Sequence, residues 1–354
     1  MMQQLATRRP RGWRISRAGF FAAALACTVG LVALVPLPRH ARADDTCGAI
    51  AQRIATARQA RDLAALTKAL AGVSGPESSC SEKARYCLGR SVALGYLAEV
   101  YARSPQKEAA GAKASPDELE ALLATARSYG APWQLLVALA DRKLERAKAA
   151  HDPALYGAAA YDYQLALLDL RDDPACADYG EPPPPVAPQI AEIHQRMSTA
   201  LLLAAPIKIA TGKCSICQWA FLSAIRNFTP SVRPLPITFN SNRSEPTAEG
   251  REAIAALVEC LNAQKPPQIV LSGHTDEVGS ASFNMKLSAE RLATVQRLLQ
   301  QGGFAGKILL EPKGKSEPYK AGDLSEYSEA ERQRLNRRIE LRAFAEGEAP
   351  TCGP

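Results

Sequence analysis

The sequence contains few of the residues on which catalytic and metal sites depend. Only four of its 354 residues are histidines, and the three beyond residue 43, His151, His194 and His274, lie far apart in the chain. The sequence also lacks a nucleophile elbow, a phosphate-binding loop and any close group of metal-ligating residues. We therefore predict that the protein is not an enzyme and that it has no catalytic residue, metal site or cofactor.

Acidic residues are missing from the first 43 positions, which carry seven arginines. An apolar run from Gly19 to about Leu37 follows the first five arginines, and Ala41-Arg42-Ala43 precedes two aspartates. This order is typical of a secretory signal peptide, although the run is also long enough to be an uncleaved membrane anchor. We expect residues 1–43 to be cleaved after Ala43, which leaves a soluble mature protein.

The net charge of the mature chain is correspondingly small. The full chain carries +7, the segment 1–43 supplies seven positive charges, and 7 − 7 leaves about zero. Nucleic-acid binding would need a clustered basic face on the folded part. We therefore expect no nucleic-acid partner, and a membrane contact only if the N-terminal segment is retained.

Cysteine usage agrees with export, because eight of the nine cysteines lie beyond residue 43. An even number of cysteines in an exported chain predicts disulfides. Eight cysteines allow about 105 pairings, so the connectivity cannot be read from the sequence. If Cys80 and Cys87 share a helix, they lie roughly 10 Å apart along its axis, which is too far for a bridge. Each then needs another partner, for which Cys47 is one candidate.

A second pair of cysteines is close in sequence, in Cys214-Ser-Ile-Cys217. A redox pair would open a helix after a strand, and no such pattern precedes it. A zinc site would need a second pair of ligands. We favour a structural disulfide, within a cysteine-containing linker over residues 206–232.

The first part of the mature chain, residues 44–205, has the periodicity of helices. Apolar residues recur at helical spacing from Cys47 to about Ala204, and Gly and Pro interrupt them at Gly130-Ala131-Pro132 and Asp152-Pro153. We predict an all-α domain of helical hairpins, which loosely resembles a tetratricopeptide-like array. Such a stack offers a groove to a partner protein or serves as a spacer, and both interpretations stay open.

The periodicity changes over residues 233–345, which precede a short tail at 346–354. Strands are expected at 235–239, 268–273, 307–310 and 338–344, and helices at 247–263, 280–301 and 328–335. This β-α-β-α-β order implies a small sheet covered by helices. The predicted fold class is therefore α+β with two domains, an all-α N-terminal domain and a βαβαβ sandwich at the C-terminus.

Two opposite charges lie close to the second expected strand. Asp276 follows the strand directly, in a loop bounded by Gly273 and Gly279, and Arg291 lies on the next expected helix. Asn284, Ser288 and Arg291 share one face of that helix. The sequence therefore places Arg291 near the loop that carries Asp276.

Three interpretations of this arrangement compete. Asp276 and Arg291 could form a structural ion pair, or Ser272, His274 and Asp276 could belong to a hydrolytic site. The hydrolytic interpretation fails, because alternate residues of a strand line one face in a row, with no sharp turn to present a nucleophile. In the third interpretation, the arginine fork binds a ligand carboxylate and the aspartate accepts an ammonium group, so that the two receive a zwitterion.

Several motif blocks over residues 233–345 resemble the signature of OmpA-like peptidoglycan-binding domains. These blocks are Gly273-His-Thr-Asp276, Gly279-Ser280, Asn284, Leu287-Ser288, Arg291 and Asn336-Arg337-Arg338. The resemblance implies a β-α-β-α-β sandwich and, as ligand, the zwitterionic head of diaminopimelate in peptidoglycan stem peptides.

The resemblance also implies a role for each matching residue. Asp276 matches the aspartate that binds the ammonium group, and Arg291 matches the arginine that binds the carboxylate. Asn242 falls where the family often places another ligand contact. Asn284 and Arg337 match positions that shape or line the pocket.

Two positions depart from the family pattern. Asn240 follows Phe239 where the family usually has aspartate, and Lys315 stands where a glycine is common. We expect the two substituted side chains not to touch Asp276 or Arg291, so that they bear only on the detail of the pocket. The helical half has no such match.

These observations predict a periplasmic, peptidoglycan-associated protein of the Gram-negative cell envelope. It would bind peptidoglycan noncovalently and tether a helical domain, which could contact another envelope protein, to the wall. One alternative is a structural spacer without a partner. The other, which we do not favour, is a cell-wall hydrolase with its site in the helical half.

Overall fold

The computed structural model describes residues 39–73, 80–104, 114–172, 175–204, 225–240 and 242–344. Residues 1–38 of the expected signal segment, most of the expected linker with Cys214 and Cys217, and the tail lie outside these residues. None of the described helices combines the length and the apolar composition that crossing a membrane requires.

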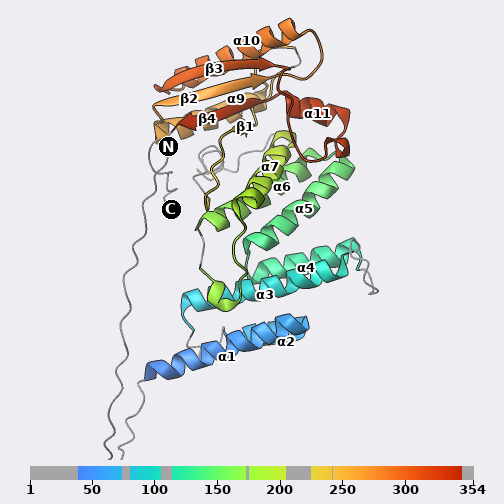
Figure 1. The fold of residues 1–354 in the computed structure, drawn as a ribbon, viewed down its shortest axis with the longest axis vertical. Helices are drawn as coiled ribbons and strands as arrows, with labels where there is room; N and C mark the ends of the chain where they lie inside the picture. The colour runs from blue at the N-terminus through green and yellow to red at the C-terminus, as the bar shows by residue number, and fades with distance from the viewer. Residues whose placement is uncertain are drawn as a thin grey trace, which may run out of the picture.

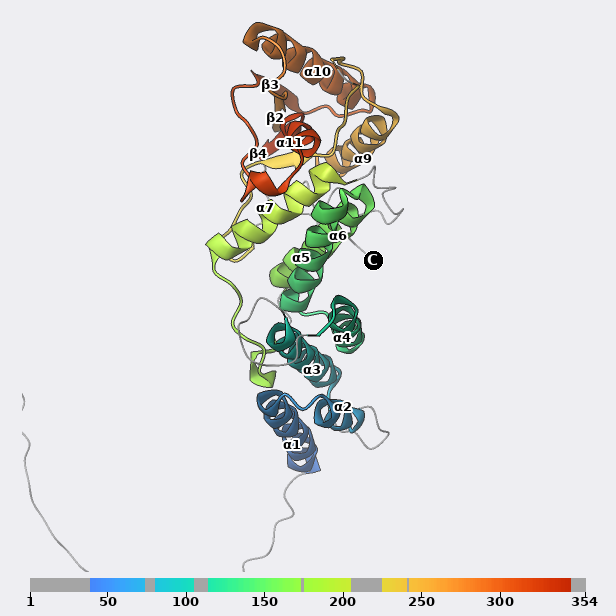
Figure 2. The same ribbon diagram turned by 90° about the vertical axis from the view of Figure 1, so that its right-hand side faces the viewer.

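The N-terminal half is a stack of helices that leads from one end of the molecule to a small sheet at the other (Figures 1 and 2). The elements are α1 (Arg39–Ala60), α2 (Leu63–Ala71), α3 (Glu82–Arg103), α4 (Pro116–Tyr129), α5 (Trp133–Ala150), α6 (Pro153–Asp172), the 3-10 turn η1 (Ala177–Tyr179) and α7 (Ala187–Leu203). Neighbouring helices pack as α3 with α4, α5 with α6, and α6 with α7. The predicted all-α character of this half is confirmed.

The helix boundaries fall at the glycine and proline breaks that the sequence shows. Gly130, Ala131 and Pro132 separate α4 from α5, and only His151 and Asp152 separate α5 from α6. His151 ends α5 in the left-handed region, with φ of 50°. The Asp152 carboxylate then accepts the amide of Ala154 at 2.8 Å, which caps the next helix. A turn this short folds α6 back antiparallel to α5.

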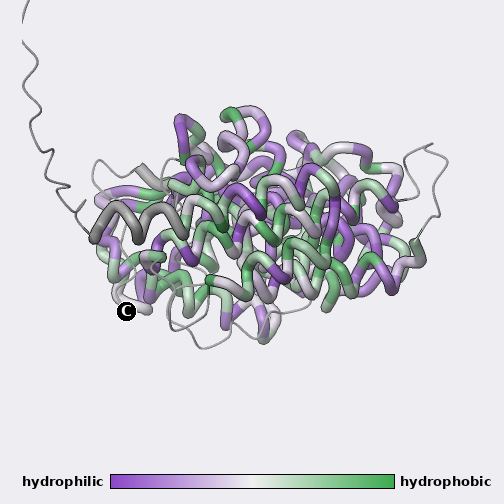
Figure 3. Tube along the Cα trace, turned by 90° about the horizontal axis from the view of Figure 1, so that it is seen from below, coloured by the Kyte–Doolittle hydropathy of each residue, from purple (hydrophilic) through white to green (hydrophobic). Residues whose placement is uncertain are grey.

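Hydrophobic and hydrophilic residues are interspersed along the chain (Figure 3), as is typical of helices that each bury one face against a neighbouring layer. One apolar core joins α1 to α4 and the start of α5, through residues such as Leu66, Leu88 and Leu123. A second core starts within α5 and continues through α6 and α7 into the C-terminal sheet. The last helices of the stack and the sheet are therefore packed as one body.

Two disulfides reinforce the helical half. Cys47 of α1 pairs with Cys80, with Cα atoms 5.4 Å apart, and Cys87 of α3 pairs with Cys176 beside η1, with Cα atoms 5.3 Å apart. Cys260 of the C-terminal domain is disulfide-bonded as well. The prediction of disulfides is confirmed, and Cys80 and Cys87 indeed bond to other cysteines.

The C-terminal half is a four-stranded sheet with helices in the predicted order. Its elements are β1 (Arg233–Leu235), α9 (Ala248–Gln264), β2 (Gln268–His274), α10 (Ala281–Gln301), β3 (Lys307–Gly314), the 3-10 turn η2 (Leu324–Glu326), α11 (Glu329–Asn336) and β4 (Ile339–Phe344). The strand order is β1-β4-β2-β3, with β2 and β3 parallel and β4 antiparallel to both of its neighbours. The predicted β-α-β-α-β sandwich is confirmed.

The first strand begins and ends earlier than the sequence pattern indicates. A strand is expected at residues 235–239, whereas β1 ends at Leu235, and Phe239 forms only an isolated bridge with Pro246. Pro236 has no N–H to offer to a ladder, so the strand stops before it. Pro234 is tolerated because, within the described part of the chain, β1 is an edge strand with β4 as its single neighbour.

Candidate functional site

The loop after β2, which presents Asp276, is fixed from three sides. The Thr275 amide donates to the carbonyl of Gly314 at 2.9 Å, and the Asn284 side chain donates to the carbonyl of Val278 at 2.8 Å. Lys315 reaches back to the carbonyl of Gly279 at 2.7 Å. Strand β3, helix α10 and the turn after β3 thus hold the loop in a defined shape.

Both carboxylate oxygens of Asp276 have partners. Oδ1 accepts the amide of Val278 at 3.2 Å, and Oδ2 lies 2.8 Å from Nη1 of Arg337. Arg337 directly follows α11, so this ion pair joins the β2–α10 loop to the start of β4. The carboxylate is therefore paired with Arg337 and not with Arg291.

Arg291 is buried, with 2% of its surface exposed, and is held by backbone and by an aromatic ring. Its Nε donates to the carbonyl of Arg243 at 3.0 Å and its Nη2 to that of Asn240 at 3.4 Å. The guanidinium carbon lies 4.9 Å from the centre of the Phe239 ring, a cation–π contact. Among the residues that the structure describes, no carboxylate forms an ion pair with Arg291.

The electrostatic environment of Arg291 reflects this lack of an anionic partner. Burial, followed by the positive charge of Arg337, lowers the pKa of Arg291 to about 10, and the charge of Asp276 counteracts the decrease only in part. The side chain stays cationic at neutral pH. A buried cation without a paired anion is costly, so an anionic group that reached it would be strongly favoured.

The remaining predicted residues lie around these charges. Asn284, Ser288 and Arg291 are all buried on one face of α10, as their spacing predicted. Asn242 is exposed in the loop whose carbonyls hold Arg291, with φ of 53°, a conformation that asparagine tolerates.

Sequence reasoning missed three features of this site. These are the Phe239 ring beneath Arg291, the contact of Lys315 with the loop carbonyls, and the pairing of Asp276 with Arg337. A long basic residue at a usual glycine position was a visible signal for Lys315. Nothing local pointed to the Asp276–Arg337 pair, because the two residues are 61 positions apart.

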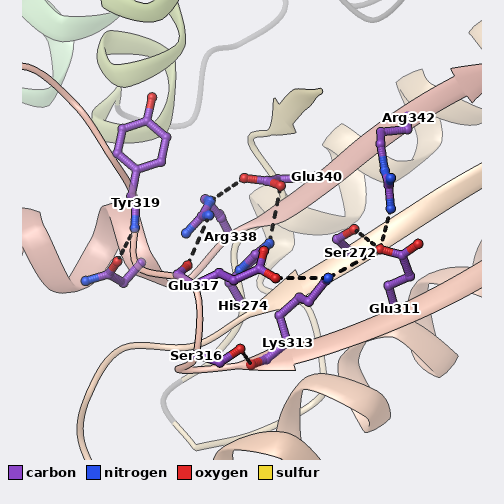
Figure 4. A network of polar contacts seen from close by, with 11 residues as sticks. Ser272, His274, Glu311, Lys313, Ser316, Glu317, Tyr319, Arg338, Glu340 and Arg342 are labelled. Atoms are coloured by element: carbon purple, nitrogen blue, oxygen red, sulfur yellow. Dashed lines mark hydrogen bonds and ion pairs between the residues drawn. The ribbon is translucent and has the colours of Figure 1, made fainter. Parts of the chain in front are cut away.

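Ser272 and His274 belong to a different network, on the strands of the sheet (Figure 4). The Ser272 hydroxyl donates to Glu311 at 3.3 Å, and Nε2 of the buried His274 lies 3.3 Å from Glu340. Ser272 and His274 thus contact two different carboxylates. The two side chains do not form the pair of nucleophile and base that a hydrolytic site needs. Among the described residues, no group of three or more potential ligands could hold a metal ion.

Glu340 gives this network a pH dependence. Burial opposes its ionisation, but the contacts with His274 and Arg338 outweigh burial and lower the pKa of Glu340 to about 2. Because the folded pKa lies below the unfolded value of about 4.3, Glu340 stabilises the fold above that value. This contribution is lost as the pH falls from about 4.3 towards 2.

We expect Glu340→Gln to lower the free energy of unfolding at pH 7 by on the order of 2 kcal/mol, and to flatten its decrease between pH 5 and pH 2. Urea unfolding at a series of pH values measures both effects. The matched control is Glu252→Gln, which changes an exposed glutamate on α9. If the free energy of unfolding depended on pH in the same way in both variants, the contacts of Glu340 would not contribute to the stability of the fold.

The comparisons with known proteins concern this half of the chain. The model of the OmpA family matches residues 238–337. Outer membrane protein A of Bordetella avium is 32% identical over 123 residues, which cover 32% of this chain and 61% of that protein. The peptidoglycan-associated lipoprotein of Pseudomonas aeruginosa is 41% identical over 76 residues, which cover 21% of this chain and 42% of that protein.

A solved structure is similar over the same region. The crystal structure of the peptidoglycan-associated lipoprotein from Burkholderia pseudomallei is 23% identical and matches 30% of this chain and 88% of that chain, with a TM-score of 0.27. The chain spans less than two thirds of the two curated relatives described above. The predicted resemblance of the C-terminal half to OmpA-like domains is confirmed.

Proposed function

We propose that the C-terminal domain binds peptidoglycan noncovalently, through the free amino-acid head of diaminopimelate, and thereby holds the helical half at the cell wall. One observation carries this proposal: Arg291 is a buried cation that, among the described residues, has no anionic partner, and it lies at a site that also contains Asp276. A ligand carboxylate would supply the missing anion.

The charges of Arg291 and Asp276 are complementary to those of a zwitterion. The planar guanidinium of Arg291 suits a carboxylate, which it can bind in bidentate fashion. An ionised carboxylate has about four lone-pair sites, so Asp276 can accept an ammonium group while Arg337 and Val278 keep their contacts. The diaminopimelate head offers both groups on one carbon atom.

The comparisons support peptidoglycan as the partner and the cell envelope as the location, without naming the group that is bound. The relatives are named as outer membrane proteins and as peptidoglycan-associated lipoproteins. These names support a location of the domain in the Gram-negative cell envelope. None of these names is that of an enzyme, and we propose that the domain is a binding module.

The test uses three synthetic stem peptides with residues 44–354, the chain expected after cleavage. The first carries diaminopimelate, the second carries its amide in place of the free carboxylate, and the third carries lysine, which retains the amine alone. We expect titration calorimetry to detect the first and to show losses of roughly 30-fold or more for the other two, since a charged pair is removed. Equal binding of all three would exclude a zwitterion site.

Zymography on purified sacculi separates binding from hydrolysis. Retention without clearing is the expected result, and clearing would instead support the hydrolase interpretation. For the helical half we propose a tethered surface for an envelope partner, with a spacer as the alternative. Cross-linking in cells from exposed helix positions such as Tyr101 and Tyr161 distinguishes the two.

A further inference from the structure

The short helix α11 contacts the helical half on one side and the candidate ligand site at its end. Its Glu331 accepts a hydrogen bond from the hydroxyl of Tyr156, on α6, at 2.7 Å. The other oxygen of Glu331 lies 3.1 Å from Nδ1 of His151, at the end of α5. Arg334 of α11 donates to the carbonyl of Ala204, at the end of α7. Three helices of the N-terminal half therefore hold α11.

The chain just before α11 is held in the same way. The Tyr319 hydroxyl lies 3.1 Å from that of Thr199 on α7, and the Tyr319 amide donates to the side chain of Asn336 at 2.8 Å. Gln195, also on α7, donates to the carbonyl of Lys320 at 2.5 Å. Both ends of α11 are thus positioned by contacts that start in the helical half.

The contacts that hold α11 also fix the position of Arg337, which directly follows this helix. Its amide donates to the carbonyl of Gln333 at 3.0 Å, which caps α11, and its guanidinium lies 2.8 Å from Asp276. A helix of two turns moves as a unit, so a shift of Glu331 also shifts Arg337. The positive charge of Arg337 in turn lowers the pKa of Arg291.

We propose that the helical half sets the ligand affinity of the C-terminal domain through α11, with Tyr156 and Glu331 as positioning residues for Arg337 and Asp276. Held in place, Arg337 orients the Asp276 carboxylate towards the ligand ammonium and adds positive charge for the ligand carboxylate. If the contacts of α11 are lost, Arg337 neither orients Asp276 nor adds its charge at the site. The ligand named here is that of the proposed function, on which this inference rests.

The chain offers a matched pair of variants for the test. Tyr156→Phe removes the hydroxyl that contacts Glu331, whereas Tyr163→Phe removes a hydroxyl that contacts Asp141 within the helical half. Both tyrosines lie on α6 and both are buried. Glu331 keeps its contacts with Ser328 and His151 in the Tyr156 variant, so the cap of α11 survives.

We expect Tyr156→Phe to weaken binding of the diaminopimelate peptide by roughly 2- to 30-fold, the range seen for coupled residues outside a ligand site. Tyr163→Phe should leave the affinity unchanged. In an Arg337→Met background, Tyr156→Phe should have no further effect, because the group it positions is gone. Equal affinities of the two tyrosine variants, or independent effects of Tyr156→Phe and Arg337→Met, would overturn the proposal.

A second measurement requires no ligand. The Nε–H signal of Arg337 in nuclear magnetic resonance spectra should shift in Tyr156→Phe and stay in place in Tyr163→Phe. If the wild-type protein fails to bind the peptide, this result contradicts the proposed function alone. The Arg337 signal then shows whether Tyr156 positions Arg337. An Arg337 signal that responds to neither variant, or equally to both, would overturn the inference.

Discussion

Replacement of Arg291 by alanine is expected to abolish retention of the protein on sacculi. The wild-type guanidinium is buried and, within the described chain, has only carbonyl groups and the Phe239 ring as partners. A ligand carboxylate at this position would meet a desolvated charge. Removal of one member of such a pair costs about 2–5 kcal/mol, or roughly 30- to 5,000-fold in affinity.

Two further variants make this result specific. Arg291→Lys keeps the charge but loses the planar fork, so it should bind more weakly than wild type. Arg297→Ala removes an exposed arginine of the same helix and should bind normally. Thermal unfolding of each variant verifies that it is folded, since Arg291 is buried. Folded Arg291 variants with wild-type retention would refute the zwitterion site.

The largest expected effect on stability is at Arg90, in the helical half. Its guanidinium, with 1% of the side chain exposed, bonds to Asp169 at 2.7 Å and to Glu181 at 2.5 Å. Asp169 also accepts the amide of Trp133, at the start of α5. We expect Arg90→Ala to lower the free energy of unfolding by about 3–5 kcal/mol, because two partly buried carboxylates lose their partner.

The matched control is an arginine with an exposed partner. Arg146 contacts Glu120 at 2.9 Å, and more than half of each side chain is exposed. Arg146→Ala should cost less than about 1 kcal/mol. Urea unfolding of the two variants and wild type gives both values, and similar costs would show that burial does not strengthen the Arg90 contacts.

The features that the sequence predicted are those with a local signal. Gly130 and Pro132 mark the end of one helix and the start of the next, as they do in the structure. The shared face of Asn284, Ser288 and Arg291 follows from the period of a helix alone. For the same reason the order of strands and helices in the C-terminal half was readable.

The features that could not be predicted from the sequence depend on contacts between residues far apart in the chain. Arg90 bonds to residues 79 and 91 positions away, and Asp276 pairs with Arg337 across 61 positions. The apolar stripes of α6 and α7 show that each helix has a buried face, but not that part of it packs with the C-terminal sheet. Only the folded chain decides which of several charges or surfaces meet.

The pairing of the cysteines also determines which parts of the chain would bear a mechanical load. If the C-terminal domain is bound to the wall as proposed, a force between it and Cys47 follows a covalent path from Cys47 to Cys80, along the chain to Cys87, and across to Cys176. The segments bypassed by the two bridges hold α2, α4, α5 and α6, and most of α1 and α3. These helices therefore lie outside the covalent path of the tension, and the proposed partner surface could keep its shape while the envelope is stretched.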